Sequence, residues 1–339
     1  MNKKTLIGIV VVTLVIAAIV GWKLNLISSD GQGGMKQLSL RLPIPVVDTS
    51  FAPYYLAKDK GFFNKNKINV TIEPGTPELN PIKMLTQGVD DFAVLGGPEL
   101  LLSARAKGAP LVAIALIHKD SDFVVFVTPK DSGLTKVNQL SGKKVGFFYG
   151  HISTDILHML LKKENIEVEE VDVGFNYGPL ISGELDAQWA FRTTAGITLP
   201  TKGFEVNFIS PADYGIITQG HVLVTTEKMI RDHPEIVQNF LNAVLDALHY
   251  SLNNVQEAVN SSVARDSTFQ ASVGKKQLAI YNKTIGNNSR LGLITEDIMG
   301  TTKTQMVEVG LIPANFNVQA AYTTHFLDGY YSGIDEYAK

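Results

Sequence analysis

Four short segments of the sequence carry side chains that could hold a small molecule. In the first, the carboxylate of Asp48 could accept hydrogen bonds from an amine or amino-pyrimidine, and Tyr54 could stack on a ring. The second contains Gly97, which lets the backbone approach a ligand, and Glu99, beside the free amide groups of a helix predicted to begin at Pro98. Each has a structural alternative, because aspartate caps turns and glutamate stabilises the first turn of a helix.

The third segment joins a glycine to hydroxyl side chains at a predicted helix start. It contains Gly150, His151, Ser153 and Thr154. Backbone amides at such a start could bind an anionic or acceptor group of a ligand. The alternative is that Ser153 or Thr154 only caps the helix.

The fourth segment follows another predicted strand and contains two aromatic residues. Trp189 or Phe191 could form the second face of an aromatic sandwich, with core packing as the alternative for Trp189. On a strand these two share one face, whereas Gln188 and Arg192 share the other. An Arg192 side chain in the cleft would favour an anionic head group such as sulfonate or carboxylate.

The elements that must position these segments occur in a repeated order. The first copy is predicted as strands 38–46, 68–72 and 92–95, with helices at 53–60 and 80–88. The second is predicted as strands 145–148, 168–173 and one running through 189 and 191, with helices at 153–163 and 178–183. Alternating strands and helices predict an α/β fold, with parallel sheets covered by helices on both faces. Ligands of such sheets bind beyond the carboxyl ends of the strands.

Two copies of this order predict two doubly wound lobes with a ligand cleft and a hinge between them. The apolar segments 123–128 and 221–225 are expected to cross between the lobes. Lobe 1 is predicted to span about 37–127 and 222–339, and lobe 2 about 128–221.

The chain after the second crossing is predicted to be mostly helical. Segment 234–252 carries an apolar stripe at helical spacing, and 296–310 is similar. The tyrosine-rich carboxyl end is expected to pack against lobe 1.

The amino terminus indicates the compartment. Lys3 and Lys4 precede an uncharged, mostly apolar run at 5–22, which as a helix would span roughly 27 Å, close to a bilayer's hydrocarbon thickness of about 30 Å. The positive-inside rule then places the rest of the chain outside the cytoplasm. Residues 1–24 are therefore predicted to be a transmembrane anchor, with a cleaved signal peptide and a secreted or periplasmic protein as the alternative. Residues 25–36 are predicted to be a flexible linker.

Composition excludes several function classes. The net charge of −3 and isoelectric point near 6.2 give no basic field for nucleic acid. The absence of cysteine excludes disulfides, thiolate metal sites and cysteine nucleophiles. The sequence contains no nucleophile elbow, phosphate-binding loop, dinucleotide fingerprint or zinc helix. We therefore predict no catalytic residue, no metal and no cofactor.

An ordered set of motifs resembles one family. The set comprises Phe-x-Pro-Tyr-Tyr-Leu-Ala-x-x-x-Gly-Phe-Phe at 51–63, Leu-x-x-Gly-x-x-Asp at 85–91, a Gly-Lys-Lys-Val-Gly run within 131–146, and the segments 180–187 and 233–237. Together they cover most of the chain from about 37 to 330, and they resemble the SsuA/THI5-like (NMT1/THI5) solute-binding proteins.

The resemblance implies a type II periplasmic-binding-protein fold and the solute-binding role in an ABC importer. The expected partners are a small-molecule ligand and the permease and ATPase subunits, and the chain is expected to be a monomer. The family's cargo includes sulfonates, nitrate, thiamine pyrimidine precursors and other heterocycles, so a heterocycle and an anion both stay open. The cysteine-rich signature of the fungal pyrimidine synthases is absent, which favours a non-enzyme. The alternative is a lyase or hydrolase that acts on a small heterocycle.

Overall fold

The computed structural model describes residues 35–337, except 77, 120–121, 150 and 286–289. The predicted anchor at 1–24, the linker up to residue 34 and the candidate site residue Gly150 lie outside the described residues. Within the described ranges, no helix combines the length and apolar composition that crossing a bilayer requires.

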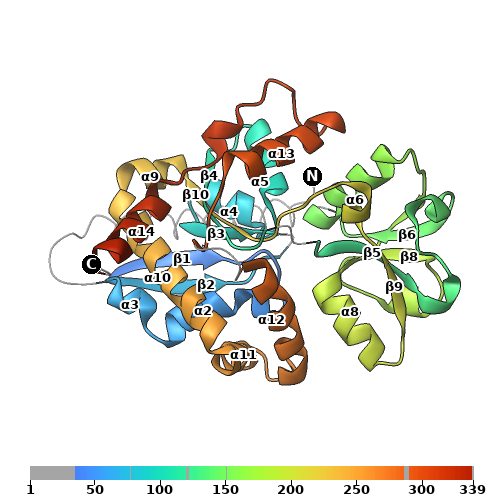
Figure 1. The fold of residues 1–339 in the computed structure, drawn as a ribbon, viewed down its shortest axis with the longest axis horizontal. Coiled ribbons are helices and arrows are strands. Elements are labelled where there is room, and N and C mark those ends of the chain that lie inside the picture. Colours follow the sequence, from blue (N-terminus) through green and yellow to red (C-terminus); the bar gives the residue numbers. More distant parts are fainter. Residues whose placement is uncertain (1–34, 77, 120–121, 150, 286–289, 338–339) are drawn as a thin grey trace, which may run out of the picture.

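Two five-stranded sheets form the centres of two α/β lobes (Figure 1). Lobe 1 is the part built on the sheet ordered β2-β1-β3-β10-β4, and lobe 2 is the part built on the sheet ordered β7-β6-β8-β5-β9. The strands of lobe 1 are β1 (Lys36–Arg41), β2 (Ile68–Glu73), β3 (Phe92–Leu95), β4 (Leu111–Leu116) and β10 (Val222–Thr226). Those of lobe 2 are β5 (Val124–Pro129), β6 (Lys144–Phe147), β7 (Glu169–Asp172), β8 (Ala187–Phe191) and β9 (Val206–Ile209).

Helices cover both faces of each sheet. Those that pack in lobe 1 are α2 (Ala52–Asp59), α3 (Phe62–Lys65), α4 (Pro81–Thr86), α5 (Pro98–Ala106), α9 (Glu227–Asp232), α10 (Pro234–Asn253), α11 (Val255–Val263), α12 (Ala271–Ile285), α13 (Glu296–Glu308) and α14 (His325–Tyr337). Those of lobe 2 are α6 (Ile152–Lys163), α7 (Gly178–Ile181) and α8 (Arg192–Thr201). Short 3-10 helices add η1 (Thr49–Phe51), η2 (Lys130–Ser132), η3 (Val137–Leu140), η4 (Pro211–Tyr214) and η5 (Val318–Ala321).

The expectation of parallel sheets needs a correction, because both sheets are mixed. β1 pairs in parallel with β2 and β3, and β6 pairs in parallel with β7 and β8. The strand that brings the chain into each lobe runs the other way: β10 is antiparallel to β3 and β4, and β5 is antiparallel to β8 and β9. These two strands start at the edge where the parallel strands end, so a chain that crosses there must enter its sheet in the opposite direction.

Glycine and proline set several of the element boundaries. β1 stops at Arg41 rather than at the predicted residue 46, because Pro43 and Pro45 cannot donate ladder hydrogen bonds. α4 begins after Asn80, whose side chain accepts hydrogen bonds from the amides of Ile82 and Lys83.

The apolar interior forms three clusters. One joins the sheet of lobe 1 to α2, α10, α11 and α14. A second runs from α5 and α13 of lobe 1 into α6, β6 and β8 of lobe 2, so a continuous apolar contact links the lobes. The third packs the other face of the lobe 2 sheet against α7 and α8.

The tyrosine-rich end of the chain packs against lobe 1, as the sequence predicted. Tyr330 and Tyr331 on α14 are buried in the lobe 1 cluster. The Tyr330 hydroxyl donates to Asp246 on α10 at 2.9 Å, and the Tyr331 hydroxyl donates to the Leu291 carbonyl oxygen at 2.9 Å. These bonds fix α14 against the long helix α10.

Candidate functional site

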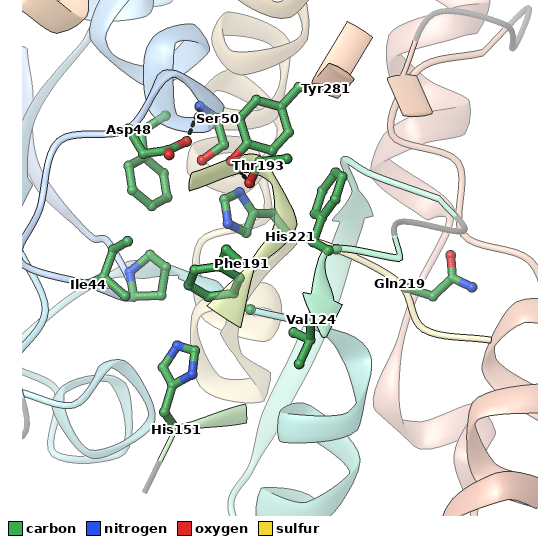
Figure 2. Close-up of a pocket in the computed structure, with 15 residues that line it drawn as sticks. Ile44, Asp48, Ser50, Val124, His151, Phe191, Thr193, Gln219, His221 and Tyr281 are labelled. Atoms are coloured by element: carbon green, nitrogen blue, oxygen red, sulfur yellow. Dashed lines mark hydrogen bonds between the residues drawn. The ribbon is translucent and has the colours of Figure 1, made fainter. Parts of the chain in front are cut away.

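A cavity lies between the lobes, at the edge where the parallel strands end and where β5 and β10 begin (Figure 2). We call it the inner cavity. From lobe 1 it is lined by Pro43, Ile44, Asp48, Ser50, Phe51, Gly96, Gln219, Gly220, His221 and Tyr281. From lobe 2 it is lined by Phe123, Val124, His151, Phe191 and Thr193. Its position agrees with the rule that α/β sheets bind ligands beyond the carboxyl ends of their strands.

Polar groups gather at one end of the inner cavity around a buried carboxylate. Asp48 is 6% exposed and is the residue that caps η1. Its Oδ1 accepts a hydrogen bond from the amide of Ser50 at 2.8 Å, and its Oδ2 accepts one from Gln277 Nε2 at 2.8 Å. Burial raises the pKa of Asp48, and the hydrogen bonds from Ser50, Tyr281 and Gln277 offset this only in part. The site therefore holds a carboxylate that would gain from a further hydrogen-bond donor.

Two hydroxyl groups lie beside this carboxylate and come from opposite lobes. The oxygens of Thr193, at the start of α8, and of Tyr281, on α12, are 2.9 Å apart and share a hydrogen bond. In Figure 2 these two side chains lie at the same end of the cavity as Asp48 and Ser50, whereas His151 lies at the opposite end. A ligand edge at the Asp48 end would meet both acceptors and hydroxyl donors.

Aromatic rings form much of the remaining wall. The rings of Phe51 and His221 are stacked, with centroids 5.1 Å apart and planes 8° apart. His118 lies behind His221, with ring centroids 5.3 Å apart. Phe123 meets Tyr281 edge to face at 5.1 Å. Such walls suit a flat ring, because aromatic pairs contribute about 0.5–1.5 kcal/mol beyond the area they bury.

On the lobe 2 side, the cavity wall rests on a second layer of rings. His151 and Phe191 line the cavity and meet edge to face, with centroids 5.5 Å apart. Behind them Trp189 contacts both rings, at 5.6 Å from His151 and 5.4 Å from Phe191. Trp189 is fully buried, and its indole Nε1 donates to the Gly174 carbonyl oxygen at 2.8 Å. The tryptophan thus supports the rings that face the cavity.

The electrostatic character of the inner cavity is set by Asp48. No lysine or arginine is among the described residues that line it. Burial lowers the pKa of His151 and of His221 to about 4, so both imidazoles are neutral at pH 7. Asp48 is then the one ionisable carboxylate among these lining residues, and the cavity favours neutral or hydrogen-bond-donating ligands over anions.

The structure brings three of the candidate residues from the sequence to the inner cavity, Asp48, His151 and Phe191. His151 caps α6 through Nδ1, which accepts the Ser153 amide at 3.2 Å, so the predicted caps Ser153 and Thr154 are replaced in that role. The Thr154 hydroxyl donates to the Phe148 carbonyl oxygen at 2.6 Å. Neither Ser153 nor Thr154 lines the inner cavity.

Three other predicted residues lie away from the cavity lining. Tyr54 is buried in the lobe 1 cluster, with no hydrogen-bond partner for its hydroxyl among the described residues. Trp189 occupies the supporting layer, which is the core-packing alternative stated for it. The Arg192 guanidinium pairs with Asp122 at 2.9 Å and lies over the ring of Phe208 at 4.8 Å. Arg192 therefore faces an ion-pair partner rather than the cavity.

Gly97 and Glu99 lie close to the cavity without lining it. Gly96 is the residue of this segment that reaches the inner cavity. A Cβ atom at Gly97 would overlap the Glu99 carboxylate, so any larger residue here would have to displace this side chain. Glu99 is 1% exposed, and its carboxylate oxygens have no hydrogen bond of normal geometry within the described residues. Burial raises its pKa to about 7, although the nearby amides of Glu99 and Gln219 act in the opposite direction.

Sequence reasoning missed most of the cavity lining, including Ser50, Phe51, Thr193, His221 and Tyr281. Ser50 and Phe51 directly follow Asp48, so the same strand-end argument would have found them. His221 starts the second predicted crossing segment, which also marks it. Tyr281 lies in the middle of α12, and no local pattern distinguishes it from a core tyrosine. Among the described residues, no cluster of three or more histidine and acidic side chains is placed to hold a metal ion.

Comparison with known proteins places this architecture in a family context. The model of the family described as "NMT1/THI5 like" matches residues 48–258. The chain is 24% identical over 318 residues to the riboflavin-binding protein RibY of Chloroflexus aurantiacus, with 88% of each chain covered. It is 26% identical over 213 residues to a formylaminopyrimidine-binding protein of Halalkalibacterium halodurans, which covers 61% of this chain and 64% of the relative.

Other similar proteins include an enzyme and a sulfonate binder. A 4-amino-5-hydroxymethyl-2-methylpyrimidine phosphate synthase of Aspergillus parasiticus is 26% identical over 295 residues, which cover 81% of this chain and 83% of the synthase. The alkanesulfonate-binding protein SsuA of Xanthomonas axonopodis, bound to MOPS, superposes with a TM-score of 0.67 at 16% identity, covering 86% of this chain and 99% of that structure. At this identity the likeness establishes the fold alone. The fold is that of the solute-binding proteins, built here on two mixed sheets.

Proposed function

We propose that this chain, which belongs to the NMT1/THI5-like family, is the extracytoplasmic solute-binding component of an ABC importer that captures a nitrogen heterocycle. The observation that carries the choice of cargo is the buried carboxylate of Asp48 in a cavity whose other described lining residues include aromatic rings and neutral histidines but no basic side chain. A ring whose N–H groups point at Asp48 would satisfy this acceptor.

The same carboxylate disfavours an anionic cargo. A sulfonate or carboxylate about 4 Å from an ionised Asp48 would be repelled by about 4 kcal/mol at the effective dielectric constant of about 20 that applies in proteins. Arg192, which the sequence offered as an anion ligand, is already paired with Asp122. The relatives support this direction, because two of them are named for binding riboflavin and a formylaminopyrimidine.

We assign cargo contact to Asp48, His151 and Phe191 among the residues chosen from the sequence. To these we add Thr193, His221 and Tyr281. Gly97, Ser153 and Trp189 support the site from behind in this proposal. Thr154, Tyr54 and Arg192 contribute to folding, and Glu99 to the packing between the lobes. The boundaries of about 37–127 with 222–339 for lobe 1, and about 128–221 for lobe 2, belong to the same proposal with two adjustments. Phe123 and β5 (Val124–Pro129) are counted with the lobe 2 sheet, and residues 219–221, which directly precede β10, are counted with lobe 1.

Capture requires the inner cavity to open. Its volume is about 40 Å³, well below the roughly 150 Å³ of an engineered cavity that admits benzene. A ring can therefore enter only when the lobes or the side chains move apart. The cargo would then bridge both lobes and stabilise the closed form through its higher affinity for that form. A permease and an ATPase would receive the cargo, and residues 1–24 would tether the protein to the membrane.

A binding screen tests this proposal. Purified protein is titrated with aminopyrimidines, flavins, alkanesulfonates and nitrate, and both heat release and thermal stability are recorded. A heterocycle present at a hundredfold its Kd should stabilise the protein by about 2.7 kcal/mol, whereas the anions should have no effect. Binding of a sulfonate or nitrate, without binding of any heterocycle, would contradict the proposal.

The same screen separates binding from catalysis. The similarity to a pyrimidine phosphate synthase makes an enzyme acting on a heterocycle the second candidate. Bound compound is recovered after long incubation and identified by mass spectrometry. A binding protein returns it unchanged, and stoichiometric or catalytic conversion would favour the enzyme.

A further inference from the structure

A second cavity adjoins the inner one, and we call it the outer cavity. The two cavities share the lining residues Pro43, Ile44 and His151, so they are direct neighbours. The outer cavity is the larger, at about 180 Å³ against about 40 Å³. It exceeds the roughly 150 Å³ that accommodates a benzene-sized group. A cargo confined to the inner cavity would leave this space unused.

Both lobes build the outer cavity, as they build the inner one. Lobe 1 contributes the loops that follow β1 and β2, including Pro45, Gly75 and Thr76. A Cβ atom at Gly75 would overlap the Leu42 carbonyl oxygen, so glycine allows these two loops to touch and to close the lobe 1 side of the cavity. Lobe 2 contributes Phe148, Tyr149 and Phe175.

The lobe 2 wall of the outer cavity is an ordered aromatic surface. Phe148 stacks on His151, with centroids 5.2 Å apart and planes 13° apart. It also meets Phe175 edge to face at 5.0 Å. These rings continue the aromatic wall of the inner cavity without a break, because His151 belongs to both. A molecule that extends from one cavity into the other would therefore stay in contact with a ring surface.

The outer cavity is uncharged but has polar groups. None of its described lining residues is acidic or basic apart from His151, whose pKa burial lowers to about 4. Asn80 lines it, and its Oδ1 accepts the amide hydrogen bonds that cap α4. Its Nδ2 donates no hydrogen bond to any described residue, so this donor is available to a ligand. The chemistry suits a neutral group that carries hydrogen-bond acceptors.

We propose that the outer cavity is a second subsite that takes a neutral, hydroxyl-bearing substituent of the ring held in the inner cavity. This inference rests on the proposed function and narrows its cargo to heterocycles that carry such a substituent. The ring edge faces Asp48, the molecule passes His151, and the substituent lies against Phe148 with a hydroxyl oxygen accepting from Asn80. A charged substituent such as a phosphate is disfavoured, since no basic group among the described lining residues would pair with it.

The experiment compares matched ligands on matched variants by calorimetry. Three ligands are used. Riboflavin is a fused heterocycle with a neutral hydroxylated chain, and lumichrome has the same ring system without that chain. The third ligand is a simple aminopyrimidine. The variants of the full-length protein are Thr76→Trp, which fills the outer cavity, and Asn80→Ser, which keeps a capping residue but removes the free amide donor. Thr86→Trp is the control, because this exposed residue lies on α4 and not in the cavity lining.

We expect the wild-type protein to bind riboflavin at least tenfold more tightly than lumichrome. Thr76→Trp should abolish this preference, and Asn80→Ser should reduce it about fivefold. Neither substitution should change the affinity for lumichrome. The control Thr86→Trp should bind both ligands with wild-type affinity. Equal affinity for riboflavin and lumichrome, or binding of the simple aminopyrimidine alone, would overturn the second subsite and leave the heterocycle proposal standing. Failure of all three ligands to bind the wild-type protein would overturn both the second subsite and the heterocycle proposal.

Discussion

Phe51 and His221 stack face to face in the wall of the inner cavity, with ring centroids 5.1 Å apart and planes 8° apart. Phe51 ends η1 and His221 directly precedes β10, so this contact joins two segments that are far apart in the sequence. A ring inserted between two stacked rings would add one van der Waals contact distance of about 3.5 Å to their separation. The pair therefore closes this part of the site and could clamp a ring after moving apart by about 3.5 Å.

Replacing Phe51 by leucine should weaken binding of the heterocycle. Leucine keeps most of the apolar volume but removes the ring face, and loss of an aromatic contact of about 0.5–1.5 kcal/mol should raise Kd by roughly 2–12-fold. Calorimetry at low temperature, where the variant stays folded, measures this change. Phe63→Leu is the matched control, since Phe63 stacks on Phe240 in the lobe 1 core at 5.7 Å. Equal effects of the two substitutions on Kd would argue against the clamp.

Asp48→Asn should reduce heterocycle affinity by about 10–150-fold. The expectation follows from the loss of a hydrogen bond to a charged acceptor, which contributes about 1.5–3 kcal/mol. Asp122→Asn is the control, because Asp122 pairs with Arg192 and does not line the inner cavity. Unchanged affinity in Asp48→Asn would remove the observation on which the cargo assignment rests.

Binding should also weaken in acid, because burial raises the pKa of Asp48 above its usual value near 3.8. A neutral cargo that donates to the carboxylate loses its acceptor as the pH falls through this raised pKa. The two cavity histidines, with pKa values lowered to about 4, should add no pH dependence between pH 6 and 8. Titrations at several pH values on wild type and Asp48→Asn separate the contributions, and an acid effect that persists in the variant would contradict the assignment.

Arg192→Gln should leave cargo binding within about threefold of wild type. Its partly exposed pair with Asp122 is expected to contribute no more than about 1 kcal/mol to folding. The measurement is a pair of titrations with the heterocycle and with an alkanesulfonate. Loss of sulfonate binding in this variant would show that the anion interpretation of Arg192 was right.

Glu99→Gln should flatten the dependence of stability on pH. Burial raises the pKa of Glu99 from 4.5 to about 7, so the folded protein binds a proton that the unfolded chain has released. Wild-type stability should therefore fall as the pH rises from about 4.5 to 7, by on the order of 3 kcal/mol. Near pH 5 the variant should match wild type, and at pH 8 it should be more stable. Denaturation curves across this range measure the difference, and parallel curves for the two proteins would refute it.

Much of the fold could be predicted from the sequence because its signals are local. The strand at Phe92–Leu95 is found as predicted, and α10 extends one residue beyond the predicted 234–252. Left-handed glycines such as Gly61 and Gly88 mark turns after helices, with φ of +73° and +69°. The direction of each strand within its sheet, by contrast, could not be predicted from local sequence signals. The antiparallel placement of β5 and β10 depends on where the chain crosses between lobes, which no short motif specifies.

The candidate site shows the same division. Asp48 and His151 were found because each closely follows a strand, and position after a strand can be read from the sequence. Arg192 also follows a strand, yet its neighbour Asp122 turns it into an ion pair. Tyr281 was missed because it sits within a helix whose pattern resembles that of any buried helix.

By itself, the sequence determined the order of strands and helices, the loops that carry polar side chains and the family. The tertiary structure decided which side chains share a cavity and which are buried. Asp48 meets Gln277, 229 positions away, and Thr193 meets Tyr281 only because two lobes face each other. Desolvation is likewise a property of the assembled site: the pKa of Asp48 is raised by burial that no single segment provides. Periodicity and turn residues encode local conformation, whereas a cleft arises from packing between distant segments.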